Sequence, residues 1–218
     1  GYREHSGIRQ RTAFLGGDWR GEETYVRFFG FSGREQSSLA FYAVEPWLLE
    51  ENPRLNPMQP EETDAFGQDL FYVQLSRPAG ERSQVGAQLY YHGAQGGLYL
   101  FDDPAAKEGR RQYGIDGGTV GALLTANLHG DGWQLATGLH GYRFARDHFS
   151  SFAGVDTYRN TGHKQELSGF AKLGRDLAER WHLFVDLQLR RAEFRYDGSV
   201  DLSPVDWTFF NPKLGVRY

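Results

Sequence analysis

The sequence contains no cysteine, and none of its apolar runs reaches the roughly eighteen residues of a membrane-spanning helix. The absence of cysteine excludes disulfide bonds and thiolate metal sites. The absence of a long apolar run excludes a transmembrane helix. The N-terminus also lacks a basic region followed by an apolar stretch, so no signal peptide is visible. If the protein is exported, we expect it to have lost its start.

Apolar residues are scarce, and acidic residues slightly outnumber basic ones. Hydrophobic residues make up 39% of the chain, the mean hydropathy is -0.59, and the formal net charge is -4. This charge argues against non-specific binding to nucleic acid. The sequence has no Gly-x-Ser-x-Gly elbow, phosphate loop, nucleotide fingerprint or zinc pattern. We therefore predict that the chain is not an enzyme and has no catalytic residue, cofactor, metal site or nucleic-acid partner.

The sequence does contain apolar and polar residues that alternate with a period of two. In the clearest segment, Leu183, Val185 and Leu187 fall on one face, whereas Asp186 and Gln188 fall on the other. This pattern is typical of a β-strand with one apolar face and one polar face. Similar segments along the chain predict about nine strands, most of them near the roughly ten residues that a tilted strand needs to cross a bilayer.

The predicted connections between these strands alternate between short and long. Short, turn-rich connections occur near 20–22, 78–82, 129–132 and 174–180, and long segments occur near 33–67, 92–113, 145–162 and 195–206. Transmembrane β-barrels have tight turns on the periplasmic side and long loops outside, and lipid contacts only one face of each strand. We therefore predict an all-β, antiparallel transmembrane barrel in the outer membrane, in contact with its lipid.

Aromatic residues make up 15% of the chain, and many lie near the predicted strand ends. Trp19, Trp133 and Trp181 lie beside short turns, where the inner aromatic girdle of a barrel is expected. A second group near the long segments is predicted to form the outer girdle. It comprises Tyr91, Tyr142, Phe144, Phe194 and Trp207.

The predicted strand number is odd, whereas single-chain bacterial barrels have an even number. An unpaired strand edge in lipid would leave N–H and C=O groups without partners. We therefore expect that residues 1–218 are part of a longer polypeptide.

Four short segments resemble, in that family's order, the barrels of TonB-dependent receptors. They are Gly-Tyr-Arg-x-x-Ser at 1–6, Tyr-x-Asn-x-Gly-x-Lys at 158–164, Asp-Leu-Gln-x-Arg at 186–190 and Asn-Pro-Lys-x-Gly at 211–215. The last of these follows the phenylalanine-rich stretch 207–210.

The resemblance implies that the intact protein has a barrel domain of about 22 strands and that residues 1–218 are part of this domain. It also implies a plug domain in the same full-length chain and energy supplied by the TonB complex. The implied ligand is a small molecule or metal chelate, such as a ferric siderophore, haem or cobalamin. The alternative is a passive porin or a structural outer-membrane barrel.

Two sets of candidate site residues follow from this interpretation. Arginine forks and aromatic faces suit anionic, ring-bearing ligands. The ligand-binding candidates in the predicted loops are Arg34, Tyr42, Trp47, Tyr99, Phe101, Arg110, Arg111 and Tyr113. The residues predicted to face the lumen and the plug are His140, Glu166, Lys172, His182, Asp186, Arg190, Lys213 and Arg217.

Overall fold

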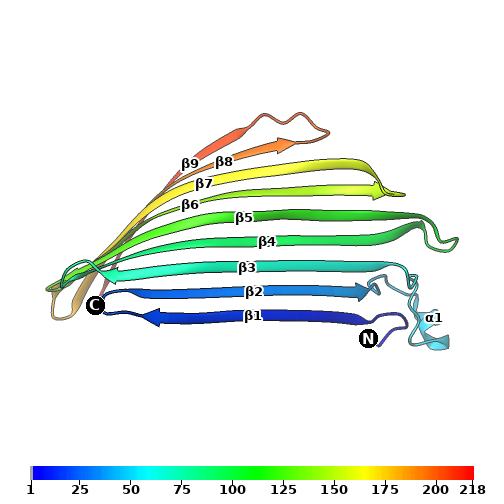
Figure 1. Cartoon of the computed structure of the whole chain (residues 1–218), viewed down its shortest axis with the longest axis horizontal. Helices are drawn as coiled ribbons and strands as arrows, with labels where there is room; N and C mark the ends of the chain where they lie inside the picture. The colour runs from blue at the N-terminus through cyan, green and yellow to red at the C-terminus, as the bar shows by residue number, and fades with distance from the viewer. Residues whose placement is uncertain (1) are drawn as a thin grey trace.

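The computed structural model describes residues 2–218, which form one antiparallel sheet of nine strands in sequence order. Gly1, the first residue of the Gly-Tyr-Arg segment, lies outside the described residues. The strands are β1 Ile8–Arg20, β2 Tyr25–Ser38, β3 Thr63–Pro78, β4 Ser83–Asp103, β5 Glu108–Gly130, β6 Trp133–Phe152, β7 Val155–Ala178, β8 Trp181–Asp197 and β9 Val205–Arg217. A short helix, α1 (Pro46–Glu51), lies between β2 and β3 (Figure 1).

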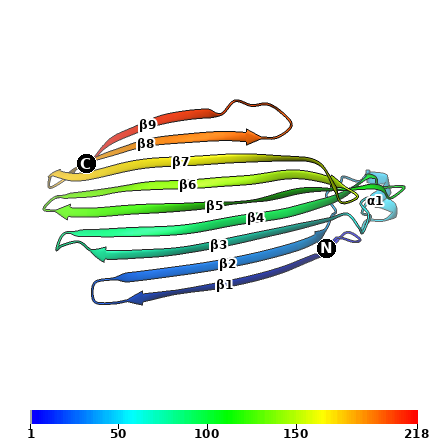
Figure 2. The same ribbon diagram turned by 45° about the horizontal axis from the view of Figure 1, so that its top comes forward.

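The strands form a single curved layer, as Figures 1 and 2 show from two directions. Among residues 2–218 no second sheet packs against this layer. β1 is paired only with β2, and β9 only with β8, so the sheet is open along both outer strands. The prediction of one curved antiparallel sheet with about nine long strands is confirmed.

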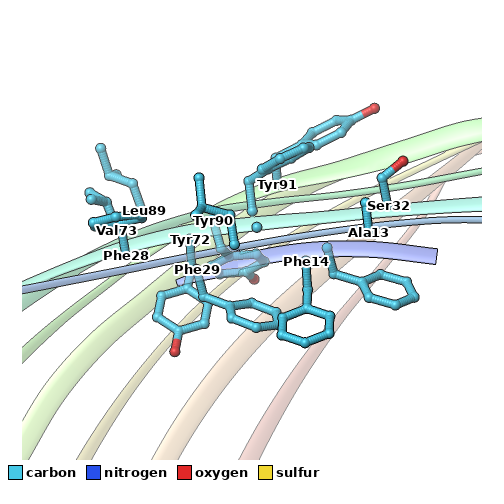
Figure 3. Close-up of a pocket in the computed structure, with 14 residues that line it drawn as sticks. Ala13, Phe14, Phe28, Phe29, Ser32, Tyr72, Val73, Leu89, Tyr90 and Tyr91 are labelled. Atoms are coloured by element: carbon cyan, nitrogen blue, oxygen red, sulfur yellow. The ribbon is translucent and has the colours of Figure 1, made fainter. Parts of the chain in front are cut away.

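The two faces of the sheet differ in character. Residues that are paired directly across two strands place their side chains on the same face. Figure 3 shows the separation near β2–β4, where Phe29 and Tyr72 project to one side and Val73 and Leu89 to the other. Tyr72 is paired with Tyr90, and Tyr90 with Gly121, so the face that carries Phe29 and Tyr72 continues across β4 and β5.

The convex face is apolar across the middle of the sheet. The concave face is polar on β7–β9, but on β1–β3 it carries the apolar row Phe14, Phe31 and Leu70. Leu89, Val120 and Leu167 on the convex face are 61–63% exposed. Among the described residues, the buried hydrophobic side chains are only Leu39, Met58 and Ala192. The sheet therefore has no apolar core of its own. Its apolar surface faces outward, as in a barrel wall surrounded by lipid.

The sidedness predicted for β8 is confirmed. Val185 is paired directly with Leu173 and Leu214, so three apolar side chains form a row on the convex face. Asp186 is paired directly with Lys172 and Lys213, which form a charged row on the concave face.

Two of the predicted long loops are mostly strand. The β4–β5 ladder continues to the pair Asp103 and Glu108, and the β6–β7 ladder continues to Phe152 and Val155. The loop predictions for 92–113 and 145–162 are therefore wrong, as is the strict alternation of short and long connections. In the β4–β5 hairpin, residues 98–101 are apolar on both faces and residues 110–112 are polar on both, so the alternation of hydrophobicity ends although the backbone pairing continues.

The tryptophans of the inner girdle lie where they were predicted, but the outer girdle does not. Trp19, Trp133 and Trp181 share the convex face with the apolar residues beside them. Of the predicted outer girdle, Tyr91 alone has its register position on that face. The other four rings belong to the concave face, namely Tyr142, Phe144, Phe194 and Trp207. Distance from a strand end predicted how far along the strands these rings lie, but only the strand register determines which face of the sheet they occupy.

A close approach between β5 and β6 at Gly117 provides a test of the register. A Cβ atom at Gly117 would lie 2.4 Å from the backbone oxygen of Ala145 and 2.7 Å from the Cα of Arg146. Gly117→Ala is expected to destabilise the intact protein by about 1–3 kcal/mol, because backbone atoms cannot move aside as a side chain can. Denaturant unfolding in lipid vesicles measures this change.

Gly162→Ala is the matched control, since its Cβ would lie 3.5 Å from the Phe194 ring, which is ordinary contact. Equal losses of stability in the two variants would contradict the observed register.

Candidate functional site

The centre of the concave face holds a group of one hydrogen bond and two ion pairs around the Glu166 carboxylate. The Tyr142 hydroxyl donates to Glu166 Oε2 over 3.2 Å, and Lys164 Nζ lies 3.6 Å from the same oxygen. Arg190 Nε lies 4.0 Å away from it. The Glu166 side chain is only 9% exposed. A buried carboxylate requires partners of this kind, so these contacts fix its position.

Tyr90 joins this group from two strands away. Its hydroxyl lies 2.8 Å from His140 Nε2, and the two rings stack with centroids 5.9 Å apart. Gly121, on the intervening strand β5, makes this contact possible. A Cβ there would lie 2.3 Å from the Tyr90 ring. Glycine therefore allows the Tyr90 side chain to cross β5 and reach β6.

The eight predicted lumen-facing residues all have register positions on the concave face. The structure divides them into three groups. The central group contains His140, Glu166 and Arg190, together with Tyr90, Tyr142 and Lys164, which the sequence did not single out as site residues. The second contains Lys172, Asp186 and Lys213, and the third contains His182 and Arg217, with Asp176 2.8 Å from His182.

The ligand-binding candidates are dispersed rather than gathered. Arg34 lies in β2, not in a loop, and forms a two-pronged ion pair with Asp69 at 2.7 and 3.0 Å. Its register position is on the convex face, so it does not face the lumen. Tyr42 and Trp47 lie in the 39–62 connection and are 44% and 60% exposed.

The remaining five candidates belong to strands of the β4–β5 hairpin. Arg110 stacks over the Tyr99 ring at 4.6 Å, and these residues share the convex face with Phe101. Arg111 and Tyr113 belong to the concave face, and Arg111 is paired with Asp102 at 3.1 Å. Their prediction as loop residues is therefore wrong. Of the arginine candidates, only Arg111 has a register position on the same face as the polar wall.

The 39–62 connection is a folded loop, which the sequence did not predict. Glu62 is 1% exposed, and its carboxylate accepts hydrogen bonds from the backbone N–H of Phe101 and of Gln59, at 3.0 and 2.8 Å. The Asn56 amide donates to the Leu39 carbonyl over 2.9 Å, and Met58 is 2% exposed. These contacts hold the loop against the end of β4.

A surface ion pair adds to this attachment. Lys107, in the β4–β5 turn, lies 3.1 Å from the Glu61 carboxylate. This hydrogen bond lowers the pKa of Glu61 below its ordinary value. Both groups are about half exposed, so the pair contributes little compared with the buried Glu62.

The attachment of the loop gives a second testable prediction. Glu62→Ala leaves two N–H groups without their acceptor, which costs about 1–3 kcal/mol for each buried group. Limited proteolysis of the intact protein is therefore expected to cleave within 39–62 about 10-fold faster. Glu61→Ala is the matched control, because it removes a neighbouring carboxylate that is exposed. Similar cleavage rates in both variants would show that Glu62 does not hold the loop.

Within residues 2–218 no helix has the length and apolar character required to cross a bilayer. The same residues contain no group of three or more histidine, aspartate or glutamate side chains placed to hold a metal ion. The concave wall offers hydrogen-bond donors, acceptors and charges to whatever lies against it.

A curved antiparallel sheet with an exposed apolar convex face and charged residues along its concave face is the form of a transmembrane β-barrel wall. Its fold is that of the barrels of TonB-dependent outer-membrane receptors, which the solved structures that match it represent. The resemblance of the four sequence segments to that family is thus confirmed at the level of the fold. The sequence matches no protein-family model, and no curated protein sequence matches it.

Three of these structures show the extent of the likeness. The ferric citrate transporter FecA, in its unliganded form, matches 98% of the chain with a TM-score of 0.80 and 9% identity. BauA, the ferric preacinetobactin receptor from Acinetobacter baumannii, matches 99% with a TM-score of 0.73 and 11% identity. The copper transporter OprC matches 97% with a TM-score of 0.70 and 16% identity. The chain spans 34%, 38% and 34% of their respective lengths. These neighbours are transport receptors, not enzymes.

Proposed function

We propose that this chain forms part of the barrel of an outer-membrane receptor that imports a scarce nutrient with energy from the TonB complex. The observation that carries the proposal is the match of nearly the whole chain to transport receptors, with a TM-score of 0.80 for FecA. The outward apolar face supports a position in the outer membrane, in contact with lipid.

The concave wall is the surface proposed to meet a plug domain of the same full-length chain. Glu166 and its partners present a polar surface made of side chains already fixed by mutual contacts. A fixed polar surface loses little conformational entropy when another domain packs against it. The remaining lumen-facing residues extend this surface along β7–β9.

The proposed ligand is a metal chelate or another small anionic compound. FecA and BauA are named for ferric chelates and OprC for copper. In this chain, the exposed rings of Tyr42 and Trp47 and the Arg111 guanidinium supply aromatic and cationic groups at the loop end of the sheet. Such groups suit anionic chelates that carry rings.

Uptake by cells that express the intact protein tests this function. A host without its own ferric-chelate and copper receptors would be supplied with radiolabelled ferric citrate, a ferric catecholate or copper, with TonB present and with TonB deleted. We expect saturable uptake of one of these compounds that is lost without TonB. TonB-independent uptake that rises linearly with concentration would support the passive porin and overturn the proposal. The absence of uptake of all three would exclude the proposed ligand class.

A pair of variants links the uptake to the concave wall. Glu166→Gln removes the charge that holds Tyr142, Lys164 and Arg190 together, so it is expected to lower TonB-dependent uptake several-fold. Glu193→Gln removes a carboxylate whose register position is on the convex face, and it should leave uptake unchanged. Equal effects would show that the polar wall has no particular role in transport.

A further inference from the structure

A groove on the convex face is lined mainly by residues of β5 and β6 and of the strands beside them. β5 and β6 lie in the middle of the sheet (Figure 1). The floor of the groove is made of small residues, because Ala122 on β5 is paired directly with Gly141 on β6. Leu89 and Leu167 lie at the same level on the flanking strands and are 62% and 63% exposed. The groove has a volume of about 560 Å³ and a mainly apolar lining. These dimensions and this lining suit a hydrocarbon chain.

Towards the loop end of the sheet the groove continues and its lining becomes more polar. A second pair of small residues, Gly118 and Ala145, contributes to its floor. Tyr91 lines it from the β4 side, and its volume is about 840 Å³. Arg143 and Gln165 line both parts. One continuous depression is therefore apolar at one end and more polar at the other.

Arg143 stands where the two parts meet, directly between Val120 on β5 and Gln165 on β7. Its side chain is exposed, and it forms no ion pair or hydrogen bond with any residue in 2–218. The polar groups beside it are already engaged with one another. Gln165 donates to Glu193, and Arg191 lies 3.1 Å from Glu193 and also pairs with Asp206. Arg143 therefore provides an uncompensated positive charge at the polar end of an apolar groove.

We propose that this groove binds one phosphorylated lipid of the outer leaflet, with its phosphate on Arg143 and an acyl chain over Ala122 and Gly141. An arginine fork forms strong, charge-assisted hydrogen bonds with phosphate oxygens. Arginine at the boundary of the hydrocarbon places its stem along apolar surface and its charge at the level of the headgroups. A free anion would contact only Arg143, whereas a phosphorylated lipid would contact both Arg143 and the apolar part of the groove. This site rests on the proposed position in the outer membrane.

Binding of defined lipids to the intact protein in detergent tests the site. The probes are lipid A with its phosphates, the same lipid after dephosphorylation, and inorganic phosphate, with binding followed by native mass spectrometry. We expect the phosphorylated lipid to bind about 10-fold more tightly than the dephosphorylated one. Arg143→Gln should remove that difference, and Ala122→Leu, which fills the floor, should weaken both lipids. Arg175→Gln is the matched control, because it removes an exposed convex-face arginine at the opposite end of the sheet.

Unchanged binding by Arg143→Gln or by Ala122→Leu would overturn the site. Competition by inorganic phosphate at the concentration of the lipid would show a free-anion site and would overturn the lipid as occupant. Uptake by Arg143→Gln should match that of the unaltered protein, since this residue faces away from the concave wall. The lipid site and the transport function can therefore fail separately.

Discussion

Replacing Val185 with arginine is expected to destabilise the intact protein in a bilayer by about 2–4 kcal/mol if Val185 lies near the midplane. Val185 belongs to the convex face and lies between Leu173 and Leu214 in a row of apolar side chains. An arginine there would have to place its charge in hydrocarbon or distort the surrounding lipid. Chemical unfolding of the protein reconstituted in vesicles measures the loss.

Gln188→Arg is the matched control, because residue 188 lies three positions away on the opposite face. There it is paired with Phe170 and Asn211, and an added charge would meet the polar lumen. We expect a change of less than about 1 kcal/mol. Similar losses in Val185→Arg and Gln188→Arg would contradict the assignment of the convex face to lipid.

Residues 2–218 expressed on their own are expected to aggregate or to fail to insert into membranes. β1 and β9 each have a neighbour on one side only, so their outer N–H and C=O groups lack partners. In lipid each such group costs several kcal/mol, and in water an exposed edge promotes association with other strands. Heat-modifiable mobility in gels and conductance across planar bilayers measure whether a closed barrel forms.

The intact protein that carries this segment is the control, and it should fold in detergent. The contrary result would be a compact, heat-modifiable barrel formed by residues 2–218 alone through pairing of β1 with β9. A small closed barrel of that kind would favour the passive porin over the energised receptor.

The strands and their faces were predictable because apolar residues occupy every second position of the central strands. Val185 and Leu187 had to share one face, and their common direction fixed that of Asp186 as well. The same rule placed all eight lumen-facing residues on the concave side. Where one face of a strand must be apolar, the alternation of residues in the sequence indicates which side chains lie on that face.

The strands beyond the apolar band were not predictable by the same rule. In the ladder from Gly93 to Asp103, residues 98–101 are apolar on both faces and residues 110–112 of the opposite strand are polar on both, so alternation no longer reports the pairing. Arg110 and Arg111 were predicted in a loop for this reason. The outer aromatic rings were assigned by their distance from predicted loops, although adjacent positions such as Tyr142 and Arg143 face opposite ways.

Contacts between distant parts of the chain could not be predicted from the sequence either. Tyr90 and His140 are separated by an entire strand, and their contact depends on a glycine at position 121. In the sequence, Glu62 is one of several charged residues in a polar connection. In the structure, its carboxylate accepts a hydrogen bond from the N–H of Phe101. Neither contact follows from local spacing, because each depends on three-dimensional closeness rather than periodicity.

The folded 39–62 loop has a consequence for recognition by antibodies. Because Glu62 and Asn56 hold its backbone, the exposed rings of Phe41, Tyr42 and Trp47 keep a defined arrangement. Antibodies raised against the native protein would encounter this arrangement as a discontinuous epitope, since Arg3, in the N-terminal segment before β1, also donates to the Tyr42 carbonyl. A linear peptide with the same sequence lacks those restraints and would be a poor immunogen for the native surface.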